Sequence, residues 1–164
     1  DATVINADKE AVAKAITAAA VSEAGFESLE AAKDAGTAFV FMGHGTAHVA
    51  KVTYSQMQTQ MQNLGYENVF IGTVEGEPEE TSAEAVIEAV KAAGYTNVVL
   101  RPLMVVAGDH ANNDMAGSDD DSWKTVFEAA GFTVDCQIHG LGEIADVQAL
   151  YVAHTKAAID ALNA

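Results

Sequence analysis

The chain has 164 residues, 49% of them hydrophobic, which is enough for one domain with a sizeable core and too few for two ordinary domains. It carries 24 acidic against 8 basic residues, a formal net charge of −16. This charge disfavours nucleic acid and anionic membranes as partners and is typical of a solubilising acidic surface. The single cysteine, Cys136, excludes an internal disulfide and a cysteine-rich zinc site.

The start of the chain bears on its location. No apolar run approaches the roughly 18 residues that a membrane span requires, and the sequence does not open with the basic and apolar segments of a secretory signal. The first residue is Asp rather than Met, so we expect a chain that was processed or cut from a longer one. We expect a cytoplasmic location, with the periplasm as the alternative.

The first predicted elements are helical. Residues 7–24 are alanine-rich and helix-periodic, with Asn6 or Asp8 as the N-cap and Gly25 as the stop. A shorter helical segment follows at residues 28–33. We expect residues 1–36 to be a helical lead-in, a connecting arm that precedes an α/β domain over residues 37–164.

The rest of the chain alternates strands with helices. Strands are predicted over residues 37–42, 68–72, 97–106 and 132–138, and helices over residues 47–64, 80–93, 121–130 and 143–162. Such alternation implies parallel strands joined by right-handed crossovers. The sequence therefore predicts a doubly wound, three-layer α/β domain with a four-stranded parallel sheet.

Each of the first three predicted strands is followed by a titratable residue within two positions of a glycine: His44, Glu75 and His110. Because the carboxyl ends of parallel strands meet at one edge of a sheet, we expect these side chains to converge. Two imidazoles and a carboxylate suit a divalent metal such as Co, Ni, Fe or Zn. Asp109 and Asp114 lie close enough in sequence to orient His110 from behind. The sequence predicts a metal site at this edge.

Other polar residues near this edge have two interpretations each. His48 is either a further ligand or proton relay, or a surface histidine of the first helical turn. His139 follows the fourth strand and could reach the edge of the site, whereas His154, within the last helix, is expected to be structural or exposed. The aspartates at residues 119–121 favour an acidic helix start, with metal delivery as the alternative.

Two common α/β functions lack their motifs. The sequence has no Gly-x-Gly-x-x-Gly after the first strand and no Gly-Lys-Ser/Thr loop, which disfavours nucleotide binding. It also has no Gly-x-Ser-x-Gly elbow, which disfavours a serine hydrolase.

Several stretches resemble the anaerobic sirohydrochlorin cobaltochelatases, the class II chelatases of cobalamin biosynthesis, and in particular their C-terminal half. The matching stretches are residues 41–48, 72–75, 102–124 and 140–143, within a resemblance that covers about residues 37–160. It implies insertion of Co2+, or in related enzymes Ni2+ or Fe2+, into sirohydrochlorin without ATP. By this resemblance His44 and His110 bind the metal and accept pyrrole protons, and Glu75 is the carboxylate at the metal.

The resemblance also implies what surrounds this site. Family members have two similar α/β halves with the tetrapyrrole between them, so we expect a second half, either from a missing N-terminal segment or from another subunit. No tightly bound cofactor is expected, because the divalent metal is a substrate. The alternatives are a ferrochelatase of the sirohaem branch and a non-catalytic module that binds a tetrapyrrole or a metal.

Overall fold

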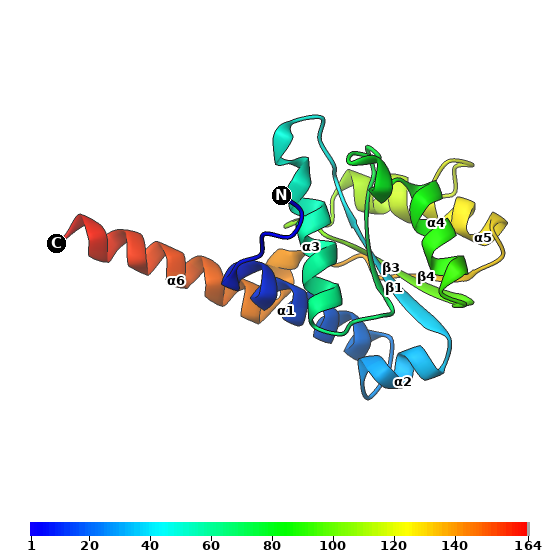
Figure 1. Cartoon of the computed structure of the whole chain (residues 1–164), viewed down its shortest axis with the longest axis horizontal. Helices are drawn as coiled ribbons and strands as arrows, with labels where there is room; N and C mark the ends of the chain where they lie inside the picture. The colour runs from blue at the N-terminus through cyan, green and yellow to red at the C-terminus, as the bar shows by residue number, and fades with distance from the viewer. Residues whose placement is uncertain (164) are drawn as a thin grey trace.

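The computed structural model describes residues 1–163, and its centre is a four-stranded parallel sheet. The strands are β1 (Thr37–Gly43), β2 (Val69–Thr73), β3 (Asn97–Pro102) and β4 (Thr133–Cys136), in the spatial order β2-β1-β3-β4. Both neighbours of β1 pair with it in parallel. The predicted four-stranded parallel sheet is therefore confirmed (Figure 1).

Helices cover both faces of this sheet. The α-helices are α1 (Ala7–Glu23), α2 (Leu29–Asp34), α3 (Val52–Asn63), α4 (Ala83–Ala92), α5 (Trp123–Ala129) and α6 (Ala145–Leu162). Short 3-10 turns form η1 (Val49–Lys51), η2 (Glu79–Thr81) and η4 (Leu141–Glu143), and η3 (His110–Met115) is a π-helix. Helices α1 and α3 pack on one face and α4 and α5 on the other, which confirms the three-layer, doubly wound class.

Alternate residues of the strands fill two separate cores, as the two-residue period of a strand requires. On one face Phe39, Phe41 and Ile71 pack against α1 and α3. On the other face Val40 and Leu100 pack against α4 and α5. Both faces of the central strands are thus apolar, which explains why the sequence shows them as continuous hydrophobic runs.

Helix α1 belongs to the first of these cores. Its N-cap is Asn6, whose side chain accepts the Lys9 N–H at 2.9 Å. Ala13, Ile16 and Ala20 are fully buried, and the two alanines let the helix approach the sheet closely. The lead-in therefore completes the hydrophobic core of the sheet, while its role as a connecting arm stays a prediction.

Several predicted element boundaries were wrong. The third strand ends at Pro102 and not at residue 106, because the chain leaves the sheet there and Val105 and Val106 are exposed. The helix predicted from residue 47 begins only at η1, because His48 is its N-cap and accepts the Ala50 N–H on Nδ1 at 3.1 Å.

Three further helices begin two or three residues later than predicted, and β4 is shorter at both ends. The side chains of Ser82 and Ser122 cap α4 and α5 by accepting backbone N–H groups, which sets their first residues. Within residues 1–163 no helix is both long and apolar enough to span a membrane.

Candidate metal centre

The ends of β1 and β2 hold His44 and Glu75 side by side. The Val74 N–H donates to the Gly43 carbonyl and the Glu75 N–H to the His44 carbonyl, both at 2.9 Å, so that pairing continues past the strands. Gly45 allows this close approach: its φ is +91°, and a Cβ there would lie 3.0 Å from the Cβ atoms of Glu75 and Thr73. The backbone of these two site residues is therefore fixed by the sheet.

The His44 ring is oriented by its own loop. Its Nδ1 lies 2.8 Å from the Gly45 carbonyl oxygen, to which only a protonated nitrogen can donate. In that tautomer Nε2 carries a lone pair, and it lies 3.9 Å from Oε1 of Glu75. Half of each side chain is exposed, so both can reach a ligand that approaches from solvent.

His110 reaches the same place from the π-helix η3. Its ring meets that of His44 edge to face, with centroids 4.7 Å apart and an interplanar angle of 83°. Its Nδ1 lies 2.6 Å from Oδ2 of Asp114, four residues later on the same turn. A carboxylate that accepts from Nδ1 leaves Nε2 free to bind a metal, as carboxylates commonly do behind metal-bound histidines.

The structure thus brings His44, Glu75 and His110 to one edge, as predicted. Among residues 1–163, however, no group of three or more His, Cys, Asp or Glu side chains is arranged to hold a metal ion. The assignment of the three as ligands therefore stays a prediction. Their exposure suits an open site better than a closed, four-coordinate structural one.

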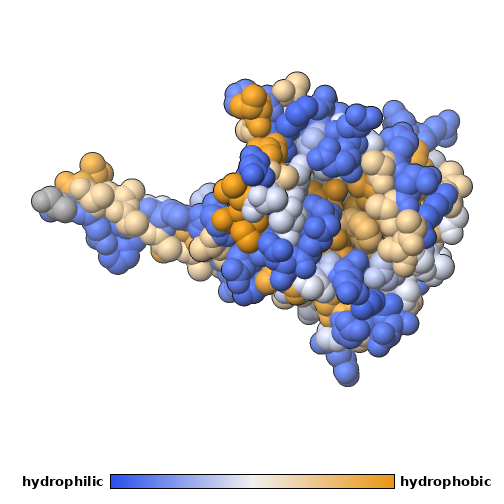
Figure 2. Space-filling model, in the orientation of Figure 1, coloured by the Kyte–Doolittle hydropathy of each residue, from blue (hydrophilic) through white to orange (hydrophobic). Residues whose placement is uncertain are grey.

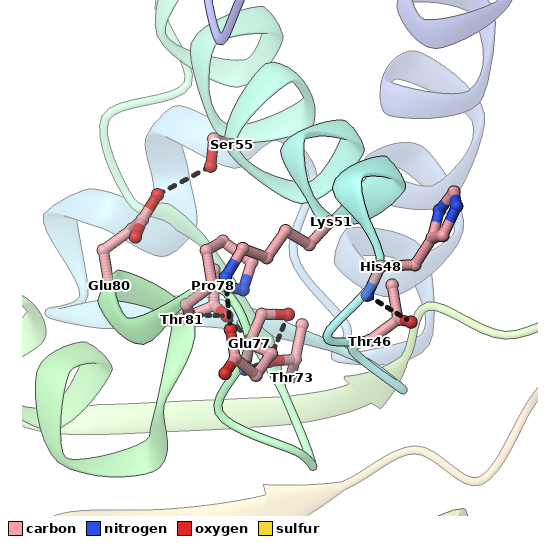
Figure 3. A network of polar contacts seen from close by, with 9 residues as sticks. All are labelled: Thr46, His48, Lys51, Ser55, Thr73, Glu77, Pro78, Glu80 and Thr81. Atoms are coloured by element: carbon pink, nitrogen blue, oxygen red, sulfur yellow. Dashed lines mark hydrogen bonds and ion pairs between the residues drawn. The ribbon is translucent and has the colours of Figure 1, made fainter.

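The residues that were predicted to support the metal site form different contacts. Asp114 contacts His110 as predicted, whereas Asp109 accepts from the Asn113 side-chain amide at 2.6 Å. His48 caps η1, and Figure 3 shows its ring pointing away from the Lys51–Glu77 pair.

The remaining histidines, His139 and His154, pair with carboxylates other than Glu75. His139 pairs with Glu143 at 2.7 Å and faces Glu23 at 3.4 Å. His154 is exposed, as expected, and pairs with Asp8 of α1 at 3.0 Å. The aspartates at residues 119–121 are exposed and precede the Ser122 cap of α5, as predicted for an acidic helix start.

Sequence reasoning missed a polar network that supports the Glu75 loop (Figure 3). Lys51 pairs with Glu77 at 2.6 Å, and the Ser55 hydroxyl donates to Glu80 at 2.7 Å. This hydrogen bond holds the pKa of Glu80 below its usual value. The partners come from the start of α3 and from the loop after β2, about 25 residues apart, so no local pattern could have identified them.

Tyr54 of α3 was missed as well. Its hydroxyl accepts the Gly45 N–H at 3.0 Å, and its ring fills the space that a side chain at Gly43 would occupy. The two glycines around His44 are therefore explained by packing and backbone conformation at the site. A tyrosine on the helix that follows a Gly-His-Gly loop was the available signal.

Two imidazoles and a carboxylate at the carboxyl edge of a parallel sheet form a donor set that suits a divalent metal. The family model "Cobalt chelatase (CbiK)" matches residues 16–160. The chain therefore belongs to the cobalt chelatase (CbiK) family, which confirms the resemblance seen in the sequence.

Relatives and a solved structure agree with this membership. The chain is 42% identical over 121 residues to a sirohydrochlorin cobaltochelatase of Salmonella typhimurium, covering 74% of this chain and 44% of that one. It is 33% identical over 135 residues to the sirohydrochlorin cobaltochelatase CbiKC of Nitratidesulfovibrio vulgaris, covering 82% and 46%. The chain thus spans less than half the length of either curated relative.

The structure of a cobalamin (vitamin B12) biosynthesis CbiX protein from Marinobacter aquaeolei VT8 has the same fold. The TM-score is 0.54 at 17% identity, over 77% of this chain and 98% of that one. At this identity the likeness concerns the fold alone.

Proposed function

We propose that this chain is the metal-binding half of a cobaltochelatase that inserts Co2+ into sirohydrochlorin without ATP. The observation that carries the proposal is the pair of histidine rings with centroids 4.7 Å apart, next to Glu75, at the carboxyl edge of the sheet. Membership in the cobalt chelatase family and the names of both curated relatives support the metal and the tetrapyrrole.

The chemistry follows from these groups. Metal insertion needs a cation held against one face of the macrocycle and bases that accept two pyrrole N–H protons. His44 and His110 present free Nε2 atoms, and neutral imidazole serves as ligand or base near pH 7. Glu75 offsets the charge of the incoming cation. Because each side chain is well exposed, the metal can enter and leave without unfolding a loop.

The second wall of the site is part of the same proposal. The three side chains lie on one edge of one α/β half, and a flat macrocycle needs a surface on its other side. A second α/β half, from a longer chain or from another subunit, would supply that wall. The relatives' lengths, more than twice the matched segment, support this.

The test is to incubate the protein with sirohydrochlorin and Co2+ and to follow the change in absorbance, beside Co2+ binding measured alone. We expect His44→Ala and His110→Ala to weaken Co2+ binding by at least about tenfold and to abolish insertion while the fold stays intact. His154→Ala, a matched exposed histidine, should change neither. Full insertion activity in His110→Ala would refute the assignment.

The same assay separates the alternatives. Pigment binding without insertion above the uncatalysed rate would favour a tetrapyrrole-binding module. Faster insertion of Fe2+ than of Co2+ would favour a ferrochelatase, since these ligands suit both metals.

A further inference from the structure

The net charge of the chain opposes the binding of the proposed substrate. Sirohydrochlorin carries carboxylate side chains around its ring, whereas the protein has a formal net charge of −16. Four of the residues 75–80, in the loop after β2, are glutamates, and Figure 2 shows a hydrophilic surface there, at the top of the view. Repulsion between exposed like charges extends over about 10 Å at 0.1 M salt. A positive charge beside this loop would therefore favour the substrate.

Lys51 supplies such a charge next to the site. It lies in η1, in the segment that follows the His44 loop, and its Nζ lies 2.6 Å from Oε2 of Glu77 (Figure 3). The two loops are in contact, because a Cβ at Gly45 would lie 3.0 Å from the Cβ of Glu75 and 3.1 Å from the Glu77 carbonyl oxygen. The Lys51–Glu77 pair therefore flanks the residues that are proposed to hold the metal.

The backbone of the loop that carries Glu77 is held by two buried threonines. The Glu77 N–H donates to the Thr73 hydroxyl at 3.1 Å, and the hydroxyls of Thr73 and Thr81 lie 2.7 Å apart. The Thr81 hydroxyl donates to the Pro78 carbonyl at 2.6 Å. Thr73 and Thr81 are 0% and 2% exposed, so water does not compete for these hydrogen bonds. The charged ends of Lys51 and Glu77 lie outside this buried network and can change partners.

The ion pair itself is accessible to a ligand. Lys51 and Glu77 each have 40% of the side chain exposed. An ion pair that is exposed to this degree contributes little to stability, because water and salt screen it. The lysine ammonium is a compact charge with three donors on a flexible stem, so it can turn from one carboxylate to another. Exchange of Glu77 for a substrate carboxylate leaves the ammonium paired and returns Glu77 to water.

We propose that Lys51 binds a peripheral carboxylate of the tetrapyrrole and so determines specificity for a polyanionic pigment, with Glu77 as the internal carboxylate that the substrate displaces. The inference rests on the proposed function and concerns the same site. Lys51 raises the affinity for the pigment, and Glu77 lowers it by competing for the ammonium. Removal of either partner therefore shifts pigment binding in opposite directions, whereas removal of either partner of a purely bracing ion pair would weaken it.

The experiment titrates metal-free sirohydrochlorin into the full chain at low salt and follows its absorbance. We expect Lys51→Met to raise the Kd about two- to fivefold and Glu77→Gln to lower it by a similar factor, which is the range typical of exposed ion pairs. In the Lys51→Met background, Glu77→Gln should have less effect than in the wild type, because the two side chains act as a pair. The fully methylated ester of the pigment, which has no carboxylates, should bind all of these proteins equally.

Lys33 and Glu67 provide a matched control. Their ion pair has the same length, 2.6 Å, and the Lys33 side chain is exposed to a similar extent, 32%. They precede β1 and β2 and so lie at the opposite, amino edge of the sheet. Lys33→Met and Glu67→Gln change the net charge as the test variants do, and they should leave the Kd unchanged. Thermal melting followed by circular dichroism checks that each variant is folded.

Several results would overturn the proposal. One is an unchanged Kd in Lys51→Met. Weaker pigment binding in both Lys51→Met and Glu77→Gln would show that the ion pair only braces the loop. Equal shifts with the ester would exclude a carboxylate as the bound group. A wild-type chain that binds neither form of the pigment overturns the proposed function as well, whereas wild-type binding that no variant alters overturns this inference alone.

Discussion

Gly72 on β2 is a position where one added methyl group should measurably destabilise the protein. Its Cα faces the ring of Trp123, and a Cβ there would overlap the ring, lying 2.9 Å from Cζ3 and 3.3 Å from the Thr81 carbonyl oxygen. Trp123 is 4% exposed and stacks on Phe127 with centroids 5.7 Å apart. Neither a backbone carbonyl nor a packed indole can move without disturbing the core between the sheet and α5.

We therefore expect Gly72→Ala to lower the free energy of unfolding by about 1–3 kcal/mol, the usual cost of overpacking a core. The melting temperature should fall by roughly 2–4 °C for each kcal/mol at this chain length. Urea unfolding followed by fluorescence measures the effect directly, because Trp123 is the chain's single tryptophan. The control is Gly108→Ala, where a Cβ would meet nothing within 4 Å and little change is expected.

A second variant isolates the cause. Trp123→Phe removes the outer ring atoms that the new methyl group would overlap, so the penalty of Gly72→Ala should shrink in that background. Circular dichroism replaces fluorescence in this comparison. An unchanged unfolding midpoint in Gly72→Ala, or a full penalty in the Trp123→Phe background, would refute the packing argument.

Three further predictions concern single side chains. Asp114→Asn should weaken Co2+ binding by about 10–100-fold, since the amide no longer fixes His110 as the carboxylate does, whereas titration of Asp109→Asn should match the wild type. Burial raises the pKa of the Cys136 thiol from 9.0 to about 11, so the thiolate fraction at pH 8 is about 100-fold lower in the folded protein. A thiol reagent should therefore react about 100-fold faster with the protein unfolded in urea. Equal rates for the folded and unfolded protein would contradict this prediction. A hydrogen bond from His139 lowers the pKa of Glu143, and one from Ser55 lowers the pKa of Glu80. Both ionised carboxylates therefore stabilise the folded protein at pH values above their unfolded pKa of 4.5, and this stabilisation is lost as the pH falls below it. The urea midpoint should drop between pH 5 and pH 3, less steeply in Glu80→Gln.

The sheet could be predicted because its strands are buried on both faces. Residues 37–43 are all buried, so that β1 is a continuous run without charged side chains in the sequence. The same signal failed at residues 103–106, which are as apolar as β3 itself. Hydrophobicity alone does not distinguish a strand from an exposed apolar loop, and Val106 is 72% exposed.

The candidate site could be predicted to the level of which residues converge, but not how they are held. His44 and Glu75 follow strands that are neighbours in the sheet, and strand ends meet by topology. The contacts that orient them come from Tyr54 and from the Lys51–Glu77 pair, whose partners are distant in sequence. Asp114 was one of two candidates behind His110, and only the π-helical turn, with its four-residue spacing, decides between them.

Arg101 shows the same limit in the core. It interrupts an apolar strand yet is 4% exposed, because its guanidinium donates to Glu23 of α1 at 2.6 Å and to Gln137 at 2.9 Å. Gln137 in turn donates to the Ala20 carbonyl of α1 at 3.0 Å. A buried cation needs such partners, and here they come from a helix 78 residues earlier in the chain. Helix α1 therefore supplies hydrogen-bond acceptors to Arg101 and Gln137 in addition to its apolar packing on the sheet.

The segment before α6 braces the loop that leads to His110. The N–H groups of Leu141 and Gly142 donate to the carbonyls of Met104 and Val105 at 2.8 and 2.9 Å, in the loop that leads from β3 to His110. Gly140 allows this contact, because a Cβ there would lie 3.0 Å from the backbone nitrogen of Ala107. Residues 141–143 form η4, and α6 begins two residues later. The loop that positions His110 is therefore braced by the same short stretch of backbone that leads into α6.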